Sequence, residues 1–282
     1  MGTLFRSWDL LGRSFRILKS DKELLWLPVM SALYCLAATL IICSAAAIVV
    51  VLPAMPLHDV AQRKLLGQHL LPFVFVFYFV TYCVGIYFNV ALVSIASDRL
   101  AGGHATLNDG LQTAWTRKWS IIEWALLAAT VGMLLQLLER RLSLLGRMIT
   151  RITGFVWALA SFFVAPVLAA EDMGPAEALF ESAELVRKTW GEEVAGTFSF
   201  GLISVVLALP GLLFPMVGAR LGQTEMFAGV ALMVIYWMLL ALVCSAARGV
   251  FVAALYRYAT TQQVSDGFHL RDLSGAWQRK QL

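Results

Sequence analysis

LLWLPVMSALYCLAATLIICSAAAIVVVL, residues Leu24 to Leu52, is the stretch that decides the fold. It contains no charged side chain, and it exceeds the roughly 20 apolar residues that a helix needs to cross the hydrocarbon core of a bilayer. Basic residues precede it, as they precede a secretory signal, but the apolar core of such a signal spans only about 7 to 15 residues. We therefore predict a membrane-spanning helix that the mature protein retains.

Five further apolar runs follow the first. The chain is 60% hydrophobic and 14% charged, with a mean hydropathy of +0.75, a balance that is not typical of a soluble domain. Because the runs are continuously apolar and do not alternate with polar residues, they favour helices over the strands of a membrane barrel. The predicted fold class is an all-α membrane protein with six transmembrane helices. The six runs are Leu24–Leu52, Leu70–Ser97, Ile121–Leu138, Gly154–Ala170, Val194–Val217 and Phe227–Tyr258.

Three repeats of one unit organise the predicted fold. Each repeat is an amphipathic interfacial helix that leads into a transmembrane hairpin, and internal repeats of this kind are typical of supersecondary units. Aligned without gaps, the repeats place a glutamate in one shared column. We predict a single membrane domain over residues 1–282, with repeats at about 1–105, 106–174 and 175–282. The amphipathic helices are Trp8–Asp21, Leu107–Ile121 and Ala176–Gly191, and the aligned glutamates are Glu23, Glu123 and Glu193.

Local signals mark the second and third amphipathic helices. Thr106 and Asp109 stand at the spacing of a capping box, with Asp in place of the usual Glu or Gln. Pro175 suits the first turn of the third helix. These helices are either elbows that turn the chain along the membrane interface or a cytoplasmic collar that binds lipid headgroups or a partner. The predicted apolar face of the third helix comprises Leu179, Ala183, Val186 and Trp190.

The distribution of Lys and Arg predicts the orientation. With both termini in the cytoplasm, the cytoplasmic segments hold about twice as many Lys and Arg residues as the opposite face, which follows the positive-inside rule. Among these residues, Arg13 and Arg16 are predicted to contact lipid headgroups. The net charge of +4 favours anionic lipid as the partner and not nucleic acid, because the basic residues flank the spans.

The loop from Glu139 to Thr153 is an exception, since it carries arginines on the face predicted to lie outside. Its apolar residues fall on one helical face, with Arg140, Arg147 and Arg151 opposite. We predict an interfacial helix whose arginines contact lipid headgroups. The alternative is that one of the flanking spans does not cross the membrane.

Arg248 is the charged residue that lies deepest within an apolar run, and a charge inside a membrane is a functional candidate. One interpretation is that its side chain extends to the headgroups. The other is that it pairs with Glu123 or forms a hydrogen bond with Asn89, which would make the three residues a ligand-binding site. The small residues around Gly249 favour close helix packing, either within the bundle or at a dimer seam.

Pro210-Gly211 and Pro215 interrupt the fifth apolar run. Proline removes a backbone donor and loosens a helix. Broken helices of this kind expose backbone groups to the substrate in many transporters. At the end of a span, however, a break has little cost, so the pattern fits both a substrate pathway and a simple kink.

The sequence offers no motif for catalysis or for cofactor binding. None of the four histidines belongs to a catalytic or zinc-binding motif, and none of the four cysteines belongs to a C-x-x-C pair. We expect no catalytic residue, no metal site and no cofactor, and we predict that the protein is not an enzyme.

Two blocks carry a resemblance to a known family. They are KSDKELLWLP at 19–28, and APVLAAED at 165–172 followed by ESAELVRKTWGE at 181–192. The chain resembles an uncharacterised bacterial family of integral-membrane proteins with six spans, and it is distantly similar to membrane domains fused to glycerophosphodiester phosphodiesterases. The resemblance implies the bacterial cytoplasmic membrane and carries over no activity.

Two hypotheses on function follow. The first is a non-enzymatic membrane component that organises anionic lipid or a protein partner, the partner being a second copy of the chain or another membrane protein. The second is a carrier or channel for a small amphiphilic or lipid-like solute. The spans contain too few polar residues to line a hydrophilic pathway, though enough for a lipid-like solute.

Overall fold

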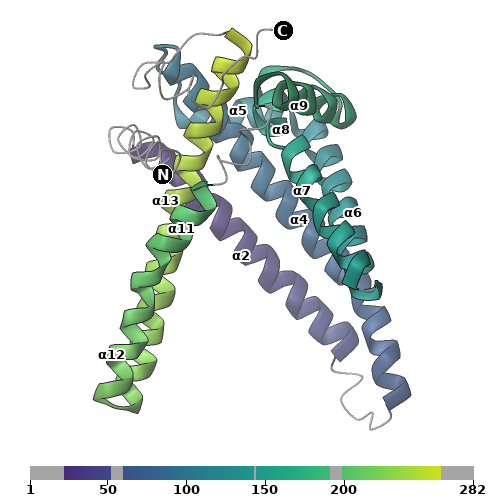
Figure 1. Cartoon of the computed structure of the whole chain (residues 1–282), viewed down its shortest axis with the longest axis vertical. Helices are drawn as coiled ribbons and strands as arrows, with labels where there is room; N and C mark the ends of the chain where they lie inside the picture. The colour runs from purple at the N-terminus through teal and green to yellow at the C-terminus, as the bar shows by residue number, and fades with distance from the viewer. Residues whose placement is uncertain (1–21, 52–59, 143, 191–198, 262–282) are drawn as a thin grey trace. The chain divides into compact units, whose positions relative to one another are not determined.

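The structure is a computed structural model that describes residues 22–51, 60–142, 144–190 and 199–261 (Figure 1). Every regular element in these ranges is a helix, which confirms the all-α class for this part of the chain. The first predicted amphipathic helix, Trp8–Asp21, lies outside them. The elements are η1 (Lys22–Leu25), α2 (Trp26–Ala46), η2 (Ala47–Val51), α4 (Val60–Leu100), α5 (Leu107–Thr116), α6 (Lys118–Arg141), α7 (Leu144–Ala160), α8 (Val164–Ala170), α9 (Pro175–Trp190), α11 (Ser199–Ala208), η4 (Leu209–Leu212), α12 (Leu213–Leu221) and α13 (Gln223–Thr261).

Six helical segments are long and apolar enough to cross a membrane, which agrees with the six predicted spans. Each of them overlaps one predicted apolar run. The helices α4 and α13 extend well past the runs that predicted them, to 41 and 39 residues. These lengths and compositions are those of a multi-pass membrane protein. The segments are Glu23–Val50, His69–Leu100, Lys118–Glu139, Gly146–Ala170, Ser204–Leu221 and Gln223–Thr261.

The chain divides into two compact units. Unit 1 includes η1, the end of α4, the start of α5, and helices α11 to α13. Unit 2 includes most of α2, α4 and α9, together with α6, α7 and α8. The threefold repeat stays a prediction. Unit 1 comprises Met1–Val29, Leu92–Gly110 and Leu185–Leu282, and unit 2 comprises Met30–Ala91 and Leu111–Glu184.

In unit 1, α12 and α13 form a tightly packed hairpin (Figure 1). Its turn is at Gly222, whose φ of +156° and ψ of 177° lie in a region that is essentially restricted to glycine. Gly218 and Gly229 let the two backbones approach closely, because a Cβ atom on either residue would collide with backbone atoms of the facing helix. Small residues therefore determine how closely these helices approach, as is typical of membrane helices.

The predicted break in the fifth span is present as the 3-10 turn η4, which contains Pro210 and separates α11 from α12. Two side chains of α13 donate hydrogen bonds to backbone carbonyls beside it. Tyr236 Oη donates to Leu207 O at 2.6 Å, and Trp237 Nε1 donates to Ala208 O at 3.0 Å. Because these carbonyls have partners within the protein, the break needs neither water nor a substrate to satisfy them.

The two halves of α13 differ in burial. From Ala246 to Tyr258 nearly every residue is buried, whereas most residues between Gln223 and Ser245 are not. Gly249 lies against Leu92 at the end of α4, and a Cβ atom on Gly249 would collide with that leucine side chain. The small residue at 249 therefore serves packing within unit 1.

In unit 2, α6 and α7 pack against each other. Trp124 stacks on Trp157 with their ring centroids 5.7 Å apart and their planes nearly parallel. Gln136 Nε2 on α6 donates to Tyr78 Oη on α4 at 3.3 Å, so the polar groups in this part of the spans have partners. Three alanines of α6 are buried, as is typical of close helix packing: Ala125, Ala128 and Ala129.

The interfacial helix predicted from Glu139 to Thr153 has other bounds in the structure, and its place at the membrane interface stays a prediction. Helix α6 ends at Arg141, and α7 runs without interruption from Leu144 through Thr153 to Ala160. The residues from Gly146 onward are thus continuous with the fourth candidate span. The periodicity was a true helical signal, but it does not show where one helix stops and the next begins.

Helix α9 starts at Pro175, as predicted, but its buried face differs from the prediction. Ala178, Ser182 and Leu185 are buried, whereas the predicted residue Leu179 is only partly buried. Ser182 lies in this face because its Oγ accepts a hydrogen bond from the Phe163 backbone N–H at 2.9 Å, where the fourth span is interrupted between α7 and α8. A hydroxyl there satisfies a buried donor, which a simple apolar stripe does not predict.

Candidate functional site

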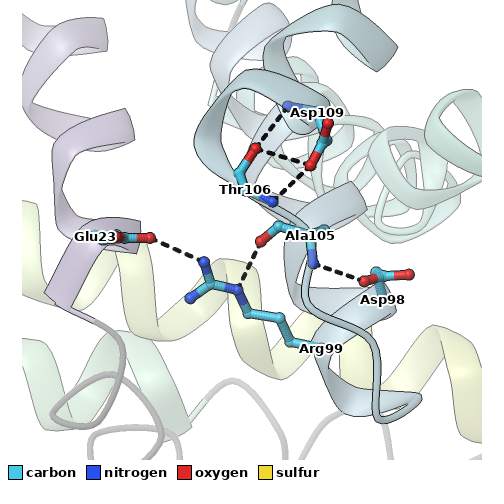
Figure 2. Close-up of polar contacts among 6 residues, drawn as sticks. All are labelled: Glu23, Asp98, Arg99, Ala105, Thr106 and Asp109. Atoms are coloured by element: carbon cyan, nitrogen blue, oxygen red, sulfur yellow. Dashed lines mark hydrogen bonds and ion pairs between the residues drawn. The ribbon is translucent and has the colours of Figure 1, made fainter.

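The end of α4 carries an arginine that connects three segments of unit 1 (Figure 2). Arg99 Nε donates to Ala105 O at 2.9 Å in the connection to α5, and Arg99 Nη2 donates to Glu23 Oε2 at 3.0 Å in η1. The arginine side chain is 18% exposed, whereas that of Glu23 is 64% exposed. The guanidinium thus joins the start of the first span to the end of the second.

The backbone around Arg99 follows a defined helix-ending motif. Gly102 has a φ of +86°, and its N–H donates to Arg99 O at 3.0 Å, while the Gly103 N–H donates to Asp98 O at 3.0 Å. This pair of bonds is the Schellman motif, which favours glycine at the left-handed position. The Asp98 carboxylate then accepts the Ala105 N–H at 2.9 Å (Figure 2). The turn therefore has a fixed geometry.

The predicted capping box at the start of α5 is confirmed. The Thr106 N–H donates to Asp109 Oδ2 at 2.8 Å, and the Asp109 N–H donates to Thr106 Oγ1 at 3.4 Å. The Thr106 backbone N–H, followed by its hydroxyl, lowers the pKa of Asp109 below its usual value. A lowered carboxylate pKa contributes stability above the unfolded-state pKa, and this contribution is lost as the pH falls through the lowered value.

Unit 2 contains a second ion pair between helix ends. Arg117 Nη1 lies 2.6 Å from Asp172 Oδ1, with side chains that are 22% and 82% exposed. Arg117 stands between α5 and α6, and Asp172 follows α8. Two residues later, the Gly174 N–H donates to Glu177 Oε2 at 3.2 Å, which caps the start of α9. The pair therefore joins the start of the third span to the end of the fourth.

We call these two ion pairs the hairpin ties. Each links a residue at the start of the first span of a hairpin, or directly before it, to a residue at the end of the second span. The pairs are Glu23–Arg99 and Arg117–Asp172. The signs are reversed between the two. Of the other two aligned glutamates, Glu123 is exposed on α6 and Glu193 lies outside the described residues, so a shared role of the three stays a prediction.

The three predicted ligand-binding residues do not form a site within either unit. Arg248 is exposed on α13 in unit 1, and Asn89 and Glu123 are exposed on α4 and α6 in unit 2. Among the described residues, none of these three side chains has a hydrogen bond or ion pair. The assignment of a ligand to them stays a prediction.

The predicted headgroup arginines fall into three groups. Arg13 and Arg16 lie outside the described residues, and the side chain of Arg140 does too. Arg147 is exposed near the start of α7. Arg151 is exposed as well, and its Nε lies 3.3 Å from Glu139 Oε1 on α6. Arg147 therefore remains available to a headgroup, whereas Arg151 already has a partner.

Exposed aromatic residues flank the junction of α5 and α6. Trp115 and Trp119 are 60% and 68% exposed, and Lys118 Nζ lies 4.5 Å from the centre of the Trp115 ring. Sequence reasoning placed the second amphipathic helix here but did not single out these side chains. The signal was the run WTRKW at 115–119, in which two tryptophans flank two cations at the start of a span.

No group of three His, Cys, Asp or Glu side chains that could hold a metal ion occurs among the described residues. The four cysteines, all of them within these ranges, are free thiols on helices α2, α4 and α13. The charged side chains that do have partners join helix ends. Their arrangement is suited to holding the ends of helices together.

The comparisons with known proteins provide a family and no activity. No curated protein matches the sequence. Residues 69–267 match a family of unknown function, DUF6159, and this range includes the second block, 165–192, on which the resemblance to an uncharacterised family rested. Since the match covers well over half of the sequence, the chain belongs to this family of unknown function.

Proposed function

We propose that this protein is a non-enzymatic component of the bacterial cytoplasmic membrane that organises anionic lipid, and through it a protein partner, at the ends of its spans. Both termini lie in the cytoplasm in this proposal. Lipid is the first partner because every span must contact it, and cations at the ends of spans attract anionic headgroups.

One observation carries the proposal: cations remain exposed at helix ends after the hairpin ties are formed. Arg147 is exposed near the start of α7, and Arg187 is exposed near the end of α9. Neither has a hydrogen bond or ion pair among the described residues. Long basic side chains in such positions can pack their methylene groups on apolar surface and extend their charge to phosphates.

The test is the composition of lipid that accompanies the protein. The full chain would be extracted from its native membrane in polymer nanodiscs, and the phospholipids would be quantified by mass spectrometry. We expect anionic phospholipids to be enriched severalfold over discs prepared from the same membrane without selection for the protein, since each cation contributes attraction. A lipid composition equal to that of the unselected discs would exclude a role in organising anionic lipid.

A second candidate is a carrier for a lipid-like solute, and Arg248 favours it. This guanidinium is exposed on α13 within a segment apolar enough to span the membrane, where a charge is costly. The broken fifth span does not add to this candidate, because Tyr236 and Trp237 already occupy two of the carbonyls beside the break.

A flux measurement tests the carrier. Liposomes containing the protein and fluorescent phosphatidylglycerol would be assayed for transfer of the label between leaflets, for the wild type, Arg248→Ala and Arg187→Ala. A carrier that uses Arg248 should lose transfer about tenfold or more in the first variant, which corresponds to one good interaction in the transition state, and should keep it in the second. No transfer above protein-free liposomes in the wild type excludes this activity.

A further inference from the structure

The junction between α5 and α6 is a bend that one residue produces. Helix α5 ends at Thr116, α6 begins at Lys118, and Arg117 between them has a φ of −92° and a ψ of 13°. The third candidate span begins at this same lysine. The bend therefore lies where an amphipathic helix outside the membrane becomes a helix that is apolar enough to cross it.

Three residues at this bend make up what we call the elbow surface: Trp115 and Trp119, which are exposed, and Lys118, which is partly buried. The two indoles are 60% and 68% exposed, which is unfavourable in water for such large apolar groups. At a bilayer interface, the same exposure is favourable, because an indole has an apolar body and a polar N–H. This side of the bend is thus suited to contact with lipid.

Lys118 supplies the charge of the elbow surface. Its ammonium group lies 4.5 Å from the centre of the Trp115 ring, within the range of a cation–π interaction. An ammonium over a ring keeps donors that the ring does not use, and these can bind an oxyanion. The neighbouring cation, Arg117, is engaged with Asp172 at 2.6 Å. That ion pair also neutralises the charge of Asp172, so this carboxylate does not oppose the binding of an anion.

The N-terminal end of helix α6 also favours the binding of an anion. Its N-cap residue makes no side-chain hydrogen bond to the first turn, so the backbone donors of that turn are left without a side-chain cap. The N-terminal end of a helix favours negative charge. The cation and the helix end thus favour the same sign of charge at the start of the third span.

We propose that the elbow surface binds the headgroup phosphate of an anionic phospholipid, with Lys118 on the phosphate and the two indoles at the level of the glycerol backbone. This site deepens the proposed function and rests on it. It commits to lipid because the two indoles need an apolar environment that a free anion does not supply. A protein partner on the same surface is an outcome of the test.

The experiment measures lipid affinity of the full chain in detergent. Phosphatidylglycerol, phosphatidylcholine or inorganic phosphate would be added to the wild type, and bound lipid would be counted by native mass spectrometry while thermal unfolding is followed. Lys118→Ala should reduce the affinity for phosphatidylglycerol about fivefold, the factor expected for one basic residue at an anionic surface. Lys118→Arg should retain the affinity.

Arg187→Ala is the comparison variant, because Arg187 is an exposed cation of the amphipathic helix α9 and is not part of the elbow surface. As one of the cations of the proposed function it contributes to lipid attraction, but its removal should reduce the affinity clearly less than Lys118→Ala does. Trp115→Leu should weaken binding while keeping the lysine, since it removes the ring beneath the ammonium group. An equal loss of affinity in Lys118→Ala and Arg187→Ala would mean that only total charge matters, and it would overturn the site.

Four further outcomes are decisive. A wild type that prefers phosphatidylglycerol, together with a Lys118→Ala variant that binds it equally well, overturns the elbow surface and leaves the proposed function standing. A wild type with no preference between phosphatidylglycerol and phosphatidylcholine overturns both the elbow surface and the proposed function. If inorganic phosphate alone stabilises the wild type to the same extent as phosphatidylglycerol, the surface is a free-anion site. If Lys118→Ala loses a co-purifying protein without any change in lipid binding, it is a protein-binding surface. Either result replaces the lipid assignment.

Discussion

Gly229→Val is expected to separate α12 from α13. A Cβ atom at this position would lie 2.5 Å from Phe214 O and 3.0 Å from Pro215 Cα, so it would meet backbone that cannot move aside without displacing α12. Overpacking a tight contact typically costs about 1–3 kcal/mol, and we expect the upper part of this range for a β-branched side chain against backbone. The measurement is the shift in the unfolding midpoint of the full chain titrated with sodium dodecyl sulfate in mixed micelles.

Gly85→Val is the matched control for this prediction. Gly85 also lies within a long apolar helix, α4, but nothing lies within 4 Å of a Cβ atom built on it. The control variant should unfold close to the wild-type midpoint. Equal destabilisation by the two substitutions would mean that helix propensity accounts for the loss and that the close approach of α12 and α13 does not.

Arg99→Met is expected to loosen the connection between the first two spans and α5. The substitution removes a charge-assisted hydrogen bond to the Ala105 carbonyl as well as the ion pair with Glu23. Bonds to charged groups contribute about 1.5–3 kcal/mol, so we expect a loss of about 2 kcal/mol in the free energy of unfolding. Glu23→Gln should cost less than about 1 kcal/mol, because the carboxylate is largely exposed.

A double-mutant cycle separates the two contributions of Arg99. We expect the coupling between Arg99→Met and Glu23→Gln to be small, with most of the loss retained when Glu23 is already replaced. Arg147→Met, at an exposed arginine of α7, should have almost no effect on unfolding. If Glu23→Gln alone reproduced the loss seen in Arg99→Met, the ion pair would be the main interaction and the carbonyl bond a minor one.

The spans were predictable because the hydrophobic thickness of a bilayer sets a length that an apolar run either reaches or does not. The same argument does not locate helix ends, since helical periodicity continues through a short turn. The turn after Arg141 shows this, because the apolar and basic periodicity on its two sides suggested one interfacial helix where the structure has the start of α7. Capping motifs are local, and Thr106 with Asp109 was accordingly predictable.

The hairpin ties could not be predicted from local sequence. Glu23 and Arg99 are separated by 76 positions, and many charged residues near span ends were equally plausible partners. The buried face of α9 was predicted wrongly for a related reason. Ser182 is buried where its hydroxyl accepts a hydrogen bond from the Phe163 backbone N–H, and that donor is available only because the fourth span is interrupted there. Pairings of this kind depend on which helix ends meet in three dimensions.

The uneven burial along α13 has a thermodynamic consequence. A helix of 39 residues is about 58 Å long, nearly twice the hydrocarbon thickness of a bilayer. Its mostly exposed first half has lipid as its solvent, and its packing there responds to acyl-chain length and lateral pressure. The buried half from Ala246 onward has other side chains of unit 1 as its surroundings, so its packing responds to side-chain volume at contacts such as that of Gly249 with Leu92. Bilayer thickness and side-chain volume would thus act on different halves of one helix.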